Sequence, residues 1–83
     1  MDKIIIHLII PAIEKDFDVK IPVHMTIGDL TGLLVKAVEE VSEQHYVSSG
    51  EEVLCLREKR IILHQDLTVK QYGIQNGNHI VMI

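Results

Sequence analysis

The chain has 83 residues, is 47% hydrophobic and carries a formal net charge of −4. This length predicts one domain over residues 1–83, which buries roughly 60–65% of its unfolded surface. The acidic balance, with no cluster of Lys or Arg, argues against nucleic acid and anionic membranes as partners. The longest apolar run, residues 4–13, is shorter than the about 20 residues of a membrane helix, so direct membrane insertion is not expected. Cys55, the only cysteine, excludes an internal disulfide and fits a reducing, cytoplasmic setting.

The first two predicted elements are strands. Residues 4–10 are largely apolar on both alternating faces, which indicates a central strand that is covered on one side and keeps some apolar surface on the other. Pro11 ends this strand. Residues 17–23 alternate between apolar and charged side chains, so they predict a half-buried strand with one solvated face.

The next segment predicts an amphipathic helix over residues 27–44. Thr26 is the expected N-cap, and Asp29 stands three residues later in the capping-box position. Apolar residues recur at helical spacing along one side, at Ile27, Leu30, Leu34, Ala37, Val38 and Val41. The opposite side carries Lys36, Glu39, Glu40 and Glu43, and together with Glu51 and Glu52 we expect this acidic surface to be simply solvated.

Shorter elements follow the helix. Residues 53–57 predict a third strand, with Cys55 and Arg57 on one face, and residues 61–63 predict a short fourth strand. The apolar spacing in residues 67–74 favours a helical turn. An Asn-Gly pair then leads into a final strand at residues 79–83, and such a pair is the strongest short hairpin signal.

We do not expect that hairpin, because the stretch before Asn76-Gly77 lacks the clean alternation of a strand. The last strand is therefore expected to pair elsewhere. The order of two strands, a helix, a strand, a short strand, a helical turn and a strand predicts an α+β fold in which two hairpins pack on one helix.

This element order, at this length, resembles the ubiquitin-like β-grasp fold. The resemblance is carried by residues 24–38, "HMTIGDLTGLLVKAV", and residues 67–83, "LTVKQYGIQNGNHIVMI". It implies a mixed sheet of four to five strands, in which the last strand lies between the first and third and runs parallel to the first.

The stretch "YGIQNGNHIVMI" is also similar to the end of the small bacterial YukD/EsaB-type proteins, which carry a Gly-Ile-x-Asn-Gly-Asp-x-Leu-like pattern. The matching residues are Gly73, Ile74, Asn76, Gly77 and Ile80, with Asn78 in place of the usual Asp. This resemblance implies a cytosolic accessory or regulatory protein of the type VII (Trp-x-Gly effector) secretion system, with components of that machinery as partners.

Ubiquitin-like modifiers and sulfur carriers react through a flexible Gly-Gly tail, where this sequence has Met82-Ile83. We therefore expect a protein that is not conjugated. The alternatives are an orphan β-grasp subunit of an enzyme complex and a modifier or sulfur carrier that acts through its C-terminus.

The sequence contains no recognisable catalytic or metal-binding motif. The five histidines form no ligand pair at metal spacing, although His7 and His79 would share one sheet face if their strands are neighbours. Cys55 has no Cys-His-Asn or Cys-His-Asp arrangement around it and is interpreted as a small strand residue. We therefore expect no enzyme, no cofactor and no metal.

A protein-binding surface is the remaining candidate site. The resemblance puts Ile9, Arg57 and Ile83 near the positions of the apolar patch of ubiquitin, with Arg57 in place of an aliphatic residue. The same sheet face would be partly apolar, which is typical of a partner site. The candidate residues are Arg57, Val81, Ile83, Cys55, His7 and Ile9. The alternative is an ordinary sheet face, or one covered by a second copy in a homodimer.

Overall fold

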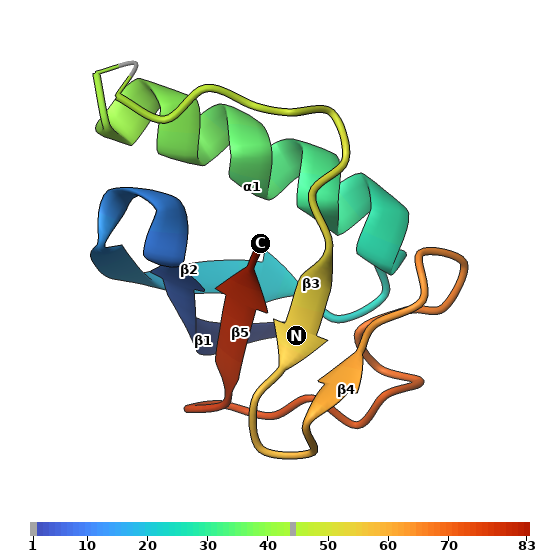
Figure 1. Cartoon of the computed structure of the whole chain (residues 1–83). Helices are drawn as coiled ribbons and strands as arrows, with labels where there is room; N and C mark the ends of the chain where they lie inside the picture. The colour runs from blue at the N-terminus through green and yellow to red at the C-terminus, as the bar shows by residue number, and fades with distance from the viewer. Residues whose placement is uncertain (1, 44) are drawn as a thin grey trace.

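The computed structural model describes residues 2–43 and 45–83 and contains one five-stranded mixed sheet packed on one helix (Figure 1). The elements in chain order are β1 (Lys3–Ile10), the 3-10 turn η1 (Pro11–Ile13), β2 (Lys15–Pro22), α1 (Ile27–Val41), β3 (Leu54–Leu56), β4 (Ile61–Ile62) and β5 (His79–Met82).

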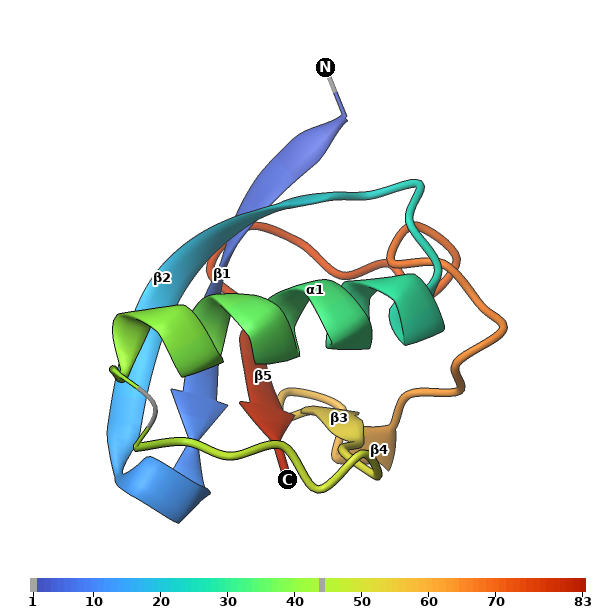
Figure 2. The same cartoon turned by 90° about the horizontal axis from the view of Figure 1, so that it is seen from above.

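The strand order across the sheet is β2-β1-β5-β3-β4. Strand β1 runs antiparallel to β2 and parallel to β5, and β3 runs antiparallel to both β4 and β5. Helix α1 lies across one face of this sheet (Figure 2). The predicted α+β fold is confirmed, as is the position of the last strand between the first and the third.

Several predicted strand bounds were wrong by a few residues. Strand β2 begins two residues before the first apolar residue of its alternating run, because the whole of β2 pairs with β1 from Lys15 onward. Strand β3 is shorter than residues 53–57, although Val53 and Ile83 still exchange two backbone hydrogen bonds of 3.0 Å. Strand β4 ends one residue early, at Ile62.

Helix α1 begins as the sequence predicts and ends earlier. The Oγ1 atom of Thr26 accepts a hydrogen bond of 3.2 Å from the backbone N–H of Asp29, which caps the first turn. The helix ends at Val41, before a C-cap at Ser42, and Glu43 has a φ of 53° that no helix continues through. The predicted end at residue 44 is therefore too late, and Gln44 itself lies outside the described residues.

The Asn-Gly pair forms no hairpin; it attaches the chain to β1. The side-chain oxygen of Asn76 accepts from the backbone N–H of Ile5 at 2.7 Å, and the N–H of Gly77 donates to the Ile5 carbonyl at 2.9 Å. Gly77 has a φ of 85°, a conformation that glycine adopts without a steric penalty. The backbone N–H of His7 donates to the carbonyl of Asn78 at 2.9 Å, so these residues begin the parallel pairing of β1 with β5.

The segment before this pair is a series of turns, as predicted. Tyr72 donates its backbone N–H to the Thr68 carbonyl at 3.3 Å, and Val69 is fully buried. Val69 and Lys70 also donate to the carbonyls of Met25 and Val23, so the turns are fixed to the chain that enters α1.

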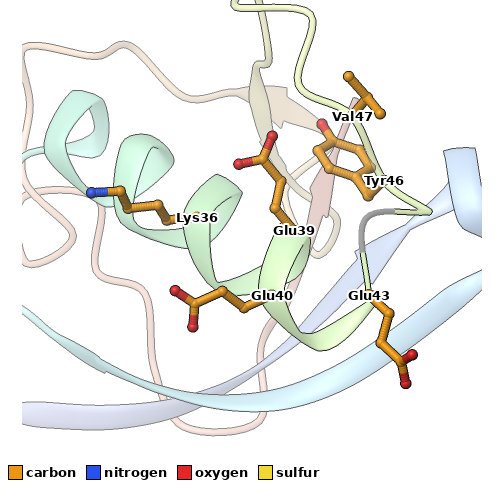
Figure 3. A pocket seen from close by; sticks show the side chains of 6 residues that line it. All are labelled: Lys36, Glu39, Glu40, Glu43, Tyr46 and Val47. Atoms are coloured by element: carbon orange, nitrogen blue, oxygen red, sulfur yellow. The ribbon is translucent and has the colours of Figure 1, made fainter.

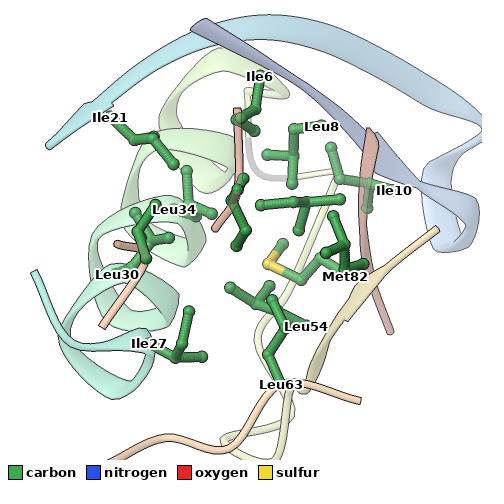
Figure 4. Close-up of a cluster of buried hydrophobic side chains, with 14 of the residues drawn as sticks. Ile6, Leu8, Ile10, Ile21, Ile27, Leu30, Leu34, Leu54, Leu63 and Met82 are labelled. Atoms are coloured by element: carbon green, nitrogen blue, oxygen red, sulfur yellow. The ribbon is translucent and has the colours of Figure 1, made fainter. Parts of the chain in front are cut away.

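The hydrophobic core lies between α1 and the sheet face that the helix covers (Figure 4). Its buried side chains come from β1, β2, β3 and β5, from one side of the helix and from the connecting segments, and they include Ile6, Leu8, Ile10, Ile27, Leu30, Leu34, Leu54, Ile80 and Met82. No polar or charged residue in the described ranges is buried. Nor is any helix in these ranges long and apolar enough to span a membrane.

Candidate protein-interaction face

The face of the sheet opposite α1, called here the outer face, carries a continuous line of apolar side chains. The strand register puts Ile9, Val81, Cys55 and Ile62 opposite one another across β1, β5, β3 and β4. Val53 and Ile83 form the adjoining pair. Of these side chains, Ile62 is 68% exposed, Ile83 66% and Val53 41%. The six residues Ile9, Val81, Cys55, Ile62, Val53 and Ile83 are called the apolar strip.

All six residues predicted from the sequence lie on this one face. Ile9, Cys55, Val81 and Ile83 belong to the apolar strip. His7 pairs with His79 in the neighbouring row, and the backbone N–H of Arg57 donates to the carbonyl of His79 at 2.9 Å. That the face binds a protein stays a prediction.

Ile62 was missed by the sequence-based prediction. Its strand has only two residues, so alternation gives no signal for which side chain faces outward. The position follows only from the pairing of Ile62 with Cys55.

Beside the apolar strip lies a polar group, called here the acid–histidine row, formed by Asp16, Asp18, His7, His79 and Glu58. His7 on β1 has its Nε2 atom 2.5 Å from Asp16 Oδ2 and its Nδ1 atom 2.8 Å from Asp18 Oδ1. The rings of His7 and His79 meet edge to face, with centroids 5.5 Å apart. The prediction that these two histidines share a sheet face is confirmed.

The contacts of His7 determine its charge. A neutral imidazole has one N–H donor, whereas both ring nitrogens of His7 face carboxylate oxygens, which only accept. The arrangement is therefore satisfied by the imidazolium form. The hydrogen bond to Asp18, followed by the bond to Asp16, raises the pKa of His7 above its usual 6.5.

Glu58 holds the other end of the row. Its carboxylate accepts from the backbone N–H of His79 at 2.9 Å and 3.1 Å and lies 2.5 Å from His79 Nδ1. Burial alone would raise the pKa of Glu58, but the hydrogen bonds from His79 outweigh it, so the pKa lies below its usual value. The carboxylate thus satisfies a backbone donor at the start of β5.

Arg57 differs from the other charged residues of the face. It is exposed, and within residues 2–43 and 45–83 its side chain makes no hydrogen bond or ion pair. Because the guanidinium of Arg57 is not engaged in such an interaction, it is available to bind a partner.

The acidic side of α1 forms a separate shallow hollow, whose lining is drawn in Figure 3. Glu39 accepts from the backbone N–H of Ser48 at 3.2 Å, and Glu52 accepts from the Tyr46 hydroxyl at 2.7 Å. Burial and the neighbouring Glu52 raise the pKa of Tyr46 to about 12. Glu39 and Glu52 therefore stabilise the loop after α1 through hydrogen bonds. The prediction that the acidic surface of α1, Glu51 and Glu52 is simply solvated was incomplete.

The described residues contain no group of three or more His, Cys, Asp or Glu side chains with the geometry of a metal site. Two further histidines of the described residues lie near carboxylates: His24 Nε2 is 3.2 Å from Asp2 Oδ2, and His64 Nδ1 is 3.8 Å from Asp66 Oδ2.

Residues 5–82 match the family model described as "WXG100 protein secretion system (Wss), protein YukD". The chain belongs to the YukD family. The predicted family is thereby confirmed, and with it a ubiquitin-like protein associated with type VII secretion. No curated protein matches the sequence of this YukD-family chain.

Solved structures similar to this YukD-family chain have the same fold at low identity. The ubiquitin-like domain of EccD5 from Mycobacterium xenopi has a TM-score of 0.81 at 13% identity, covering 100% of this chain and 94% of that one. The ubiquitin-like domain of the type VII secretion protein EccD1 from Mycobacterium tuberculosis has a TM-score of 0.77 at 14% identity, covering 100% and 99%. A chain of an ESX-5 inner membrane complex has a TM-score of 0.79 at 13% identity, and the match covers 21% of that longer chain.

Proposed function

We propose that this YukD-family chain is a non-enzymatic, cytoplasmic protein-binding module that serves a type VII secretion system as an accessory or regulatory component. Its partner, in this proposal, is a protein component of that system and docks on the outer face. The observation that carries the proposal is the apolar strip, which spans four neighbouring strands and has no covering element in the described residues.

The energetic argument rests on the exposed aliphatic side chains of the strip. Ile62 and Ile83 each leave about two thirds of their surface in water. Complete burial of an aliphatic side chain of this size contributes roughly 1.5–3 kcal/mol. A contiguous apolar surface with a polar border is typical of a protein interface, and a partner that covers the strip would gain the part of this energy that corresponds to the exposed two thirds of each side chain.

The polar border supplies selectivity in this proposal. Arg57 would bind a carboxylate or a carbonyl group of the partner, since its guanidinium is exposed and engaged by no described side chain. His7 and His79 already bind carboxylates of the chain itself, so they define the edge of the interface. Proteins that bind the apolar patch of ubiquitin contact an aliphatic residue at the position of Arg57, so in this proposal they would not bind this chain.

The choice of partner is supported by the family and by the fold. The family is described as part of the WXG100 secretion system, and two similar domains belong to EccD proteins of type VII systems. A third similar chain is part of an ESX-5 inner membrane complex. We infer that this chain binds a component of the corresponding machinery in its own organism.

The experiment is affinity capture from native cytosol and solubilised membranes with four immobilised proteins. These are the wild type, the outer-face variants Arg57→Glu and Ile83→Lys, and the control variant Val47→Lys. Val47 is 78% exposed and lies in the loop after α1, away from the outer face. We expect the wild type and the control to recover the same type VII component, and both outer-face variants to lose it.

Two outcomes would contradict the proposal. If the outer-face variants recover the component as well as the wild type does, the outer face is not the docking site. If mass spectrometry finds the chain covalently joined to another protein, the chain acts as a modifier and its role is not binding alone.

A further inference from the structure

Strand β2 forms an open edge of the sheet, with β1 as its only neighbouring strand in the described chain (Figure 2). The hydrogen bonds of β1 show which groups of β2 point outward. The backbones of Ile5 and His7 bond toward β5, so the alternate residues of β1 bond toward β2. By the β1–β2 register, Asp16, Asp18 and Lys20 then direct their backbone N–H and C=O groups away from the sheet.

Charged residues on an edge strand normally prevent pairing with unrelated strands. Here the charges are also arranged so that the strand can pair with itself in one register. Two antiparallel copies of β2 can be related by a two-fold axis at Phe17, Asp18, Val19 or Lys20. The axis at Phe17 would oppose Asp16 to Asp18, and the axes at Asp18 and Lys20 would oppose identical charges.

Only the two-fold axis at Val19 avoids every like-charge pair. It opposes Asp18 of each copy to Lys20 of the other on the outer face, which are attractive cross-strand pairs. Asp18 keeps its contact with His7 of its own chain, so each aspartate lies between that imidazole and Lys20 of the other copy.

The other face of β2 supplies apolar contacts in the same register. Phe17 and Val19 are only partly buried against the core, and Phe17 borders a hollow that also contains Val41, which is 61% exposed. With the axis at Val19, the two Val19 side chains meet and each Phe17 faces Ile21 of the second copy. We propose that two copies of this chain associate through antiparallel pairing of their β2 strands, centred on Val19, into one continuous ten-stranded sheet.

This dimer leaves the apolar strip uncovered, because the strip runs from β1 to the opposite edge of the sheet at β4. The proposal is therefore independent of the docking function of the outer face. A dimer would present two outer faces on the same side of one sheet, so a partner with two binding segments would bind with a higher apparent affinity.

The test is a charge swap measured by sedimentation equilibrium. The variant Lys20→Asp turns both attractive pairs into repulsive pairs, as does Asp18→Lys, so each should dimerise about tenfold or more weakly than the wild type. An equimolar mixture of the two variants opposes lysine to aspartate at every pair and should form a heterodimer. The double variant D18K/K20D should dimerise with itself, and circular dichroism shows whether each variant is folded.

The register is tested separately with Val19→Cys in a Cys55→Ser background. Under mild oxidation this variant should form an intermolecular disulfide, because directly opposed residues of a non-hydrogen-bonded pair lie close enough for one. Three outcomes would overturn the proposal. They are a wild type that stays monomeric up to millimolar concentration, a dimer that neither charge variant weakens, and a mixture of the two variants that stays monomeric.

Discussion

The two faces of the sheet differ in what their side chains do. On the face that α1 covers, Ile6, Leu8 and Ile80 are at most 1% exposed and belong to the hydrophobic core. On the outer face, neighbouring residues of the same strands form the apolar strip and the acid–histidine row, and most stay in contact with water. The covered face therefore specifies the fold, while the outer face can be adapted to a partner at little cost in stability.

The largest effect on the free energy of unfolding is expected from a comparison of two adjacent isoleucines of β1. Ile6 is fully buried and Ile5 is 48% exposed on the outer face. Ile6→Ala should lower the free energy of unfolding by about 2–5 kcal/mol, since it removes buried methylenes and leaves a cavity. Ile5→Ala should cost about 1 kcal/mol or less. Urea unfolding measures both, and equal losses would mean that the two faces do not differ in this way.

A smaller effect is expected at the rim of the outer face, where Asn76 bonds to Ile5. Asn76→Ala removes the acceptor for the Ile5 N–H and should lower the free energy of unfolding by about 1 kcal/mol. The neighbouring Gln75→Ala is the control, because only the backbone of Gln75 takes part in a hydrogen bond that the structure shows. Equal stability of the two variants in urea would exclude a structural role for the Asn76 side chain.

His7 should make the stability depend on pH. Its pKa is raised in the folded chain, so its contribution is fully present below the ordinary value of 6.5 and is lost as the pH rises through the folded pKa. The urea midpoint of the wild type should therefore fall more between about pH 6 and about pH 9 than that of His7→Gln. Parallel pH profiles for the two proteins would contradict the bridging role of His7.

The smallest predicted effect on stability belongs to Arg57. Arg57→Glu should change the free energy of unfolding by no more than about 0.5 kcal/mol, because the side chain is exposed and makes no hydrogen bond or ion pair with a described residue. Thermal unfolding followed by circular dichroism checks this. A large loss of stability would assign Arg57 a structural role and would remove it from the proposed interface.

Much of the fold could be predicted from the sequence because one face of each long element is apolar at a regular period. The alternation in β2 correctly predicted a half-buried strand, and the helical spacing correctly placed Ile27, Leu30, Leu34 and Val38 in the core. The same spacing was wrong for Ala37 and Val41, which are exposed. The bounds were less predictable, since Lys15 joins β2 only through its pairing with β1. The helix end depends on the left-handed backbone at Glu43, and a glutamate does not predict that conformation.

The candidate site was predictable only in part. Strand alternation, with the resemblance, put six residues on one face. The register that joins Ile62 to Cys55, and Asp16 and Asp18 to His7, involves chain segments that are far apart or very short. Such contacts depend on tertiary pairing, so local periodicity cannot reveal them.

The most direct test of the outer face uses Cys55, the only cysteine, which lies within the apolar strip and is partly exposed. The native protein is labelled at Cys55 with a thiol-reactive photocrosslinker, and a matched protein carries the same label in the variant Cys55→Ser with Val47→Cys. After illumination in native extract, the label at Cys55 should capture a type VII secretion component that the label at position 47 does not. Capture of that component only from position 47, or equally from both positions, would contradict docking on the outer face.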